Sequence, residues 1–230
     1  MPTLDEILRA RQERIDEVHR LEPGRAALLV IDMQRGFLEP RAALEVPAGR
    51  AIIPEVRRLI VACRERRVPV IFTQFVYATA VPCLRGDPFG PEHLPARPGE
   101  PTGFGRPSGN CLIPPDAEPG PDSVEIVPEL APRPGELVVR GHTYDKFHGT
   151  PLDLALRGQD VRYLIIAGVV TEICVNCTLL SAANRDYRVT AVTDGVASPW
   201  PDLQQACFEI WRRKFARLRT TDEILSEIHG

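Results

Sequence analysis

Short apolar runs alternate with amphipathic stretches along most of the 230-residue chain. The runs at 26–31 and 162–168 are predominantly apolar, a pattern typical of parallel strands that helices cover on both faces. The stretch at 52–67 instead repeats its apolar residues with the period of an α-helix. This alternation predicts an α/β fold: a doubly wound, mainly parallel six-stranded sheet with helices on both faces, as in a Rossmann-like three-layer sandwich.

The remaining predicted elements are strands at 68–73, 136–140 and 188–193, helices at 151–157, 174–185 and 202–213, and a last short strand and helix. Residues 1–22 are predicted to form an amphipathic amino-terminal arm, and residues 23–230 to form one domain. Prolines and glycines are frequent at 77–135, which we interpret as a long loop insertion that shapes the pocket.

The charge balance argues against several classes of partner. Lys plus Arg number 28 against 31 Asp plus Glu, a net charge of −3, so no uniform basic field is available for nucleic acid. No apolar run approaches the roughly 20 residues of a membrane span, and the first twenty residues lack a signal peptide's apolar stretch. We therefore expect a cytoplasmic protein that binds a small molecule and neither nucleic acid nor membrane.

Parallel sheets of this kind bind ligands at the carboxyl ends of their strands. Cys174 lies at such an end and opens a predicted helix, whose partial positive charge should lower the pKa of the thiol. Backbone N–H groups of the same turn could hold an oxyanion. Asp32 ends the apolar strand at 26–31 and could accept the thiol proton. Taken singly, a buried structural cysteine and a strand-ending aspartate explain both residues equally well.

Three segments, in this order, resemble the isochorismatase-like cysteine hydrolases: LLVIDMQRGF at 28–37, FHGTPL at 147–152 and GVVTEICV at 168–175. The similarity runs from about Ala26 to the C-terminus. Within that family the chain is most similar to amidohydrolases of carbamoyl and ureido compounds, such as N-carbamoylsarcosine, ureidoacrylate and biuret hydrolases. The resemblance implies a small-molecule amide or ureido substrate and a homodimer or homotetramer.

The resemblance also implies roles for individual residues. Asp32 corresponds to the catalytic aspartate and Cys174 to the nucleophile, with an oxyanion hole at Val170, Thr171 and Cys174. A cis peptide bond without proline is implied at about Val170–Thr171. The implied reaction is attack of the thiolate on an amide or ureido carbonyl, loss of ammonia or an amine, and hydrolysis of the acyl-enzyme.

The lysine that completes the family's catalytic set is absent from its usual place. It lies six residues before the family's equivalent of Phe147, and that position here is Gly141. Its cation would stabilise the thiolate beside the carboxylate. Three basic residues could replace it: Arg140, His142 and Lys146. In a regular strand, Arg140 and His142 point to the face opposite Gly141, whereas the long stem of Lys146 could reach back.

Four residues near the strand ends are expected to wall the pocket: Gln34, Phe37, Tyr77 and Tyr144. The stretch at 73–77 reads TQFVY and lacks the aspartate and histidines that form a metal site in other branches of the family. We therefore expect no metal and no cofactor.

The leading hypothesis is a cysteine amidohydrolase of a small amide, carbamoyl or ureido compound. A second hypothesis, favoured by Gly141, is a catalytically impaired family member that serves as a binding or assembly subunit. A third is isochorismatase-type vinyl ether hydrolysis, which uses no cysteine nucleophile, so Cys174 argues against it. A fourth is thiol–disulfide exchange between Cys174 and Cys177, which have the C-x-x-C spacing.

Overall fold

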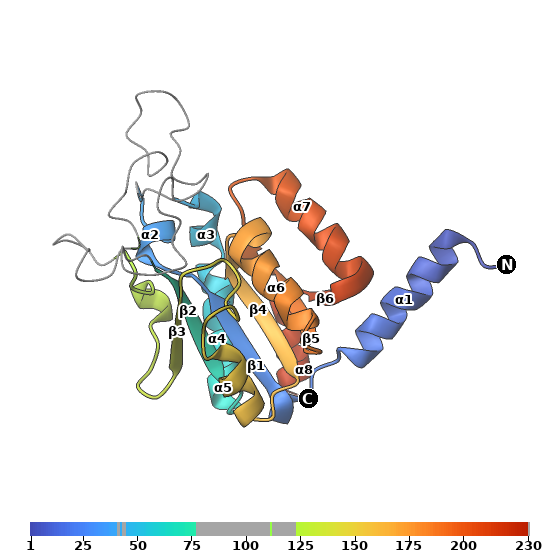
Figure 1. Ribbon diagram of the computed structural model, residues 1–230, viewed down its shortest axis with the longest axis horizontal. Coiled ribbons are helices and arrows are strands. Elements are labelled where there is room, and N and C mark those ends of the chain that lie inside the picture. The colour runs from blue at the N-terminus through green and yellow to red at the C-terminus, as the bar shows by residue number, and fades with distance from the viewer. Residues whose placement is uncertain (41, 43–44, 77–110, 112–122, 230) are drawn as a thin grey trace, which may run out of the picture.

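Parallel strands form the centre of the protein (Figure 1). The computed structural model describes residues 1–40, 42, 45–76, 111 and 123–229. The six-stranded sheet has the order β3-β2-β1-β4-β5-β6, and every neighbouring pair is parallel. The strands are β1 (Ala26–Ile31), β2 (Val70–Phe75), β3 (Leu137–Gly141), β4 (Tyr163–Val169), β5 (Arg188–Ala197) and β6 (Ala216–Arg219). The predicted doubly wound α/β fold is thus confirmed.

Helices cover both faces of this sheet (Figure 1). The helices of the described residues are α1 (Leu4–Val18), α2 (Arg35–Leu38), α3 (Pro47–Ala51), α4 (Ile53–Glu65), α5 (Leu152–Gly158), α6 (Asn176–Ala183), α7 (Pro201–Ile210) and α8 (Thr221–His229), of which α1 extends away from the sheet. Two short 3₁₀ helices are η1 (Pro23–Arg25) and η3 (Pro128–Leu130), and two π-helical turns are η4 (Thr171–Val175) and η5 (Trp211–Phe215). Within the described residues, no helix is both long enough and apolar enough to cross a membrane.

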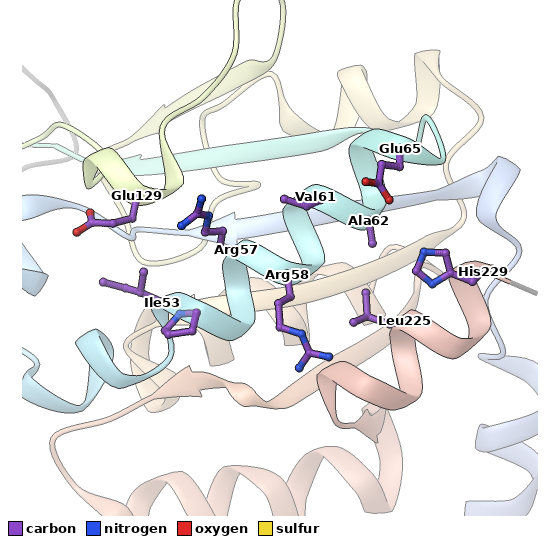
Figure 2. Close-up of a pocket in the computed structure, with 10 residues that line it drawn as sticks. Ile53, Arg57, Arg58, Val61, Ala62, Glu65, Glu129, Leu225 and His229 are labelled. Atoms are coloured by element: carbon purple, nitrogen blue, oxygen red, sulfur yellow. The ribbon is translucent and has the colours of Figure 1, made fainter.

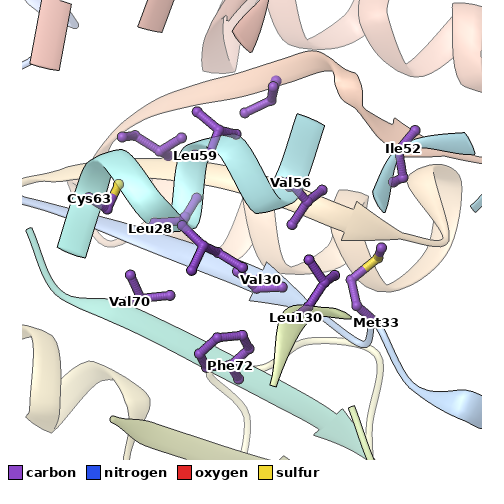
Figure 3. Close-up of a cluster of buried hydrophobic side chains, with 14 of the residues drawn as sticks. Leu28, Val30, Met33, Ile52, Val56, Leu59, Cys63, Val70, Phe72 and Leu130 are labelled. Atoms are coloured by element: carbon purple, nitrogen blue, oxygen red, sulfur yellow. The ribbon is translucent and has the colours of Figure 1, made fainter. Parts of the chain in front are cut away.

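Strand β1 is buried at all of its residues because successive side chains enter different layers of the fold. Leu28 and Val30 belong to the apolar cluster that lies under α4 and α8 (Figure 3). Leu29 and Ile31 belong to a second cluster on the other face, under α5, α6 and α7. The α4 residues in the first cluster are Val56, Leu59, Ile60, Ala62 and Cys63. Burial on both faces is what the wholly apolar run predicts.

Helix α1 extends away from the sheet, and none of its residues is buried (Figure 1). Its first turn is closed by a capping box between Thr3 and Glu6. The domain holds the other end of the helix, where Arg219 pairs with Asp16 at 3.2 Å and His19 Nδ1 lies 2.9 Å from the carbonyl oxygen of Val189.

The order of the strands reverses between β1 and β4. After β3 the chain returns to the opposite side of β1, so β1 and β4 are neighbours, with Ile31 paired to Gly168. Ligands of open α/β sheets bind at such switch points. Gly168 has a φ of +130°, and a Cβ atom there would collide with the carbonyl oxygen of Ile31. Only glycine allows the two strands to approach this closely.

Several predicted boundaries differ from the structure. The helix predicted from residue 174 begins at Thr171 with the π-helical turn η4, and the helix predicted to residue 213 ends at Ile210 and continues as η5. A π turn continues the direction of a helix, so the apolar period does not reveal it. Strand β5 continues past the predicted residue 193 to Ala197. The apolar pattern misses this extension because Thr193 and Asp194 are polar and only half-buried.

Gly168→Ala is expected to destabilise the protein by roughly 3 kcal/mol, through the collision with Ile31 and a φ that alanine avoids. Gly24→Ala is the matched control, since a Cβ there has nothing within 4 Å, and it should change stability by less than about 0.5 kcal/mol. Urea unfolding measures both values. Equal stability of the two variants would show that β1 and β4 can separate without cost.

Candidate active site

Asp32 is the first residue after β1, and its carboxylate is fully buried. Its backbone has a φ of 49°, in the left-handed region that aspartate adopts more readily than most residues. Thr73 on β2 donates its hydroxyl proton to Asp32 Oδ1 at 2.6 Å and accepts the backbone N–H of Asp32 at 3.2 Å. Strand β2 therefore fixes Oδ1 of the Asp32 carboxylate, and a different residue pairs with Oδ2.

That partner is Lys146, whose Nζ lies 2.8 Å from Asp32 Oδ2. Both side chains are 0% exposed, so the pair is shielded from water and salt. Lys146 lies in the turn-rich segment between β3 and α5. Its Nζ also donates to the carbonyl oxygen of Thr143 at 3.1 Å and lies 4.8 Å from the ring centre of Phe75. The ammonium is thereby surrounded by a carboxylate, a carbonyl and an aromatic face.

Of the three cations considered from the sequence, the structure brings Lys146 to Asp32. A Cβ built on Gly141 would lie 3.6 Å from Lys146 Cδ, so the lysine stem passes beside the position where the family lysine would begin. Arg140 Nε instead donates to Gln74 Oε1 at 3.0 Å. His142 Nδ1 lies 3.0 Å from the carbonyl oxygen of Val76. Among these three side chains, Lys146 is therefore the one that pairs with Asp32.

Cys174 lies in η4, directly after β4, and is 4% exposed. Its thiol interacts electrostatically with both Lys146 and Asp32. The non-proline cis peptide bond is Val169–Val170, one bond earlier than the Val170–Thr171 bond expected. The sequence indicates only the neighbourhood of this bond, because the residue types of both peptide bonds are equally compatible with it.

Burial and neighbouring charges oppose one another at Lys146 and Cys174. Burial works to lower the pKa of Lys146, but the charges of Asp32 and Cys174 outweigh it, so the pKa is raised and the ammonium persists. Burial raises the pKa of Cys174 well above that of a free thiol, Lys146 lowers it, and Asp32 raises it further. The thiol is therefore protonated at rest. The expectation of a lowered pKa was wrong, because burial outweighs the partial charge of the helix start.

Three of the four expected pocket residues lie in packed surroundings. Gln34 is fully buried, with its amide bonded to both the N–H (2.6 Å) and the carbonyl oxygen (3.0 Å) of Phe75. Phe37 is 5% exposed, with its ring centre 6.3 Å from that of Phe75. Tyr144 is half-buried and stacks on Phe75, with 5.6 Å between the two ring centres. Gln34 and Phe37 thus brace the end of β2, and Tyr77 lies outside the described residues.

Thr171, expected at the oxyanion hole, is fully buried and donates its hydroxyl proton to Gln204 Oε1 on α7 at 3.2 Å. Val170 immediately precedes η4, and its carbonyl oxygen accepts the N–H groups of Ile173 and Val175, both at 3.1 Å. Amides of a first helical turn face away from the helix body. The turn that carries Cys174 is therefore held by its own backbone and by α7.

A groove of about 580 Å³ between α4 and α8 lies away from Asp32, Lys146 and Cys174 (Figure 2). Its lining includes Arg58, which is already paired with Glu55 and Asp222. No side chain that lines it is a cysteine, serine or threonine. In the part of the chain that the structure describes, no three His, Cys, Asp or Glu side chains gather as a metal site.

Two residues of this site could have been identified from the sequence more firmly. Lysine occurs only at positions 146 and 214, although Lys plus Arg total 28. A chain that uses arginine almost everywhere retains a lysine where a compact, deeply buried ammonium is needed, and that bias singles out Lys146. Thr73 lies beside Asp32 because β2 and β1 are neighbours. The available signal was the position of Thr73 at the end of the strand predicted at 68–73 and of Asp32 directly after the strand predicted at 26–31.

Known proteins are similar to this chain in sequence and in fold. Residues 26–223 match the family model described as Isochorismatase domain, so the chain belongs to the isochorismatase family. It is an isochorismatase-like hydrolase, and its relatives include amidohydrolases. Ureidoacrylate amidohydrolase RutB of Pseudomonas savastanoi pv. phaseolicola is 30% identical over 207 residues, covering 86% of this chain and 80% of the relative. The predicted family membership is confirmed.

Solved structures agree with this assignment. A cysteine hydrolase from Pseudomonas syringae pv. phaseolicola 1448A superposes with a TM-score of 0.72 and 27% identity, covering 91% of this chain and 95% of that one. N-carbamoylsarcosine amidase from Thermoplasma acidophilum gives a TM-score of 0.66 and 25% identity, covering 86% of this chain and 97% of that one.

Lys146→Met is expected to make the thiol of Cys174 harder to ionise, because the ammonium lowers the pKa of that thiol. The pH profile of Cys174 alkylation by iodoacetamide should shift upward by about one pH unit, which corresponds to a tenfold slower reaction at a given pH. Mass spectrometry of the Cys174 peptide measures the rate. Lys214→Met, at the exposed second lysine, is the matched control. Identical profiles for the two variants would contradict the assigned role of Lys146.

Proposed function

We propose that the protein is a cysteine-dependent amidohydrolase that cleaves a C–N bond of a small amide, carbamoyl or ureido compound through an acyl-enzyme. The observation that carries this proposal is the 2.8 Å contact of Lys146 with Asp32 beside the buried thiol of Cys174. A carboxylate, an ammonium and a thiol are the groups needed to move one proton and stabilise one thiolate. Relatives named as ureidoacrylate amidohydrolase and N-carbamoylsarcosine amidase support the substrate class.

The proposed reaction begins with transfer of the thiol proton of Cys174 to Asp32. The thiolate attacks the substrate carbonyl carbon, and the carbonyl oxygen becomes an oxyanion held by backbone N–H groups at Thr171 and Cys174. The C–N bond then breaks as the nitrogen takes the proton from Asp32 and leaves as ammonia or an amine. Water, deprotonated by Asp32, hydrolyses the thioester, and the proton returns to the sulfur.

Lys146 has an electrostatic role in this sequence. Negative charge lies on Asp32 at rest and moves to the sulfur of Cys174 when the proton is transferred. The ammonium interacts with both groups, so it offsets the cost of a buried anion in either state. Because burial raises the pKa of the thiol, we expect the thiolate to form during the reaction, with Asp32 accepting the proton, and not to persist at rest.

The presence of this cation bears on the second hypothesis. The impaired family member was favoured by the loss of the lysine at Gly141, and Lys146 supplies an ammonium to the same carboxylate. The argument for a subunit without catalysis therefore loses its main support.

The wild-type chain is expected to release ammonia from at least one of ureidoacrylate, N-carbamoylsarcosine and biuret. Cys174→Ser and Asp32→Asn should each lower kcat by roughly a thousandfold or more, because one removes the nucleophile and the other its proton acceptor. A coupled ammonia assay measures the rates, and Cys63→Ser, at a buried cysteine on α4, is the matched control. Full ammonia release by Cys174→Ser would reject the cysteine mechanism.

Moving the lysine to residue 141 tests whether activity depends on an ammonium beside Asp32 and not on residue 146 itself. Lys146→Ala should lose at least about a hundredfold in kcat, because Asp32 and the thiolate are left without a cation. Adding Gly141→Lys should regain at least about tenfold, since a Cβ at residue 141 has its nearest neighbours at 3.5 and 3.6 Å, ordinary contact distances.

Gly158→Lys in the Lys146→Ala background is the matched control, because that glycine has nothing within 4 Å and lies at the end of α5. Equal activity of the two double variants would mean that residue 141 does not direct a lysine toward Asp32.

A further inference from the structure

The lysine of this site is carried by a segment without regular structure. Residues 142–151 are turns and bends between β3 and α5, whereas Gly141, the expected position of the lysine, is the last residue of β3. A lysine side chain loses rotamer entropy when it is held in one place, and an irregular backbone adds to that loss. Holding Nζ at 2.8 Å from Asp32 therefore requires contacts that fix the segment itself.

Thr178 makes two of those contacts with one hydroxyl group. It lies on α6, one helical turn after Cys174, and its side chain is 0% exposed. Its Oγ1 accepts the backbone N–H of Lys146 at 3.2 Å and donates to the carbonyl oxygen of Tyr144 at 3.3 Å. Both bonds act on the main chain, so they set the position of the lysine's Cα and not only of its side chain.

Further along the same face of α6, a second set of bonds holds the neighbours of Lys146. Thr178 and Ser181 are three residues apart on α6, a spacing that places them on one side of the helix, and Arg185 follows just after its end. Ser181 donates to Asp145 Oδ2 at 2.7 Å, and Asp145 Oδ1 accepts the N–H of residue 147 at 2.9 Å. Arg185 donates to the hydroxyl of Ser181.

We propose that Thr178 is a positioning residue, which locks the Lys146 segment onto the helix that follows Cys174 and so sets the place of the ammonium relative to the sulfur. The proposal rests on the function assigned above to Lys146 and Cys174. Thr178 lies on α6, which directly continues the turn η4 that carries Cys174, so a shift of α6 moves the sulfur and the lysine main chain together.

Thr178→Val tests this role, because it removes the hydroxyl and keeps the side-chain volume nearly unchanged. We expect the pH profile of Cys174 alkylation by iodoacetamide to move upward, with a rate at pH 8 lowered by about fivefold to tenfold. Thr178→Ser should restore the rate to within about twofold, because it restores the hydroxyl. Thr190→Val is the matched control, a buried threonine on β5 whose hydroxyl accepts from Arg217 at 3.3 Å, and it should leave the profile unchanged.

The Lys146→Met background separates positioning from a general loss of structure. If Thr178 acts through Lys146, adding Thr178→Val to Lys146→Met should slow alkylation by less than about twofold further. An undiminished effect of Thr178→Val in that background, or an unchanged profile of the single variant, would overturn the proposal.

Ser181→Ala provides a second route should Thr178→Val fail to fold, because it loosens the half-buried second tie. It should shift the profile in the same direction by a smaller amount, and no shift would overturn the proposal. The alkylation assay uses no amide substrate. A chain that shows these shifts but releases no ammonia from the three compounds would keep the role of Thr178 and lose the proposed reaction.

Discussion

A charge pair kept out of water organises this site. Lys146 Nζ and Asp32 Oδ2 lie 2.8 Å apart, and both side chains are fully buried. Taking each ion out of water costs several kcal/mol, so a pair of this kind is weak evidence of a contribution to stability. In the proposed reaction its use is chemical, because the same ammonium also interacts electrostatically with the thiol of Cys174. Negative charge can pass between carboxylate and sulfur while its counter-ion stays in place, which keeps the reorganisation of the surroundings small.

The sheet brings these groups together by its topology. Asp32 and Cys174 follow neighbouring strands, β1 and β4, at the point where the order of the strands reverses. Gly168 allows the strands to approach, and Thr73 on β2 orients the carboxylate from the other side. The cation alone comes from a segment outside the sheet, and helix α6 supplies the contacts that hold it. Tertiary contacts, and not a strand, thereby hold Lys146 in place.

How far the sequence predicts this arrangement depends on the range of the interactions involved. Wholly apolar runs identify β1 and β4, and strand ends identify Asp32 and Cys174, because these signals are local. The choice of Lys146 over Arg140 and His142 depends on how residues 142–151 pack against α6, which no local pattern encodes. The direction of the pKa shift of Cys174 was also wrong from sequence, since burial of the thiol depends on the whole fold.

The most direct test of the central claim is mass spectrometry of the protein quenched with acid during turnover of a ureido or carbamoyl substrate. The account predicts an added mass equal to the acyl part of the substrate on the peptide that contains Cys174, removable by hydroxylamine as a thioester is. An acyl group found on a different residue, or undiminished turnover by protein whose Cys174 is already alkylated, would contradict it.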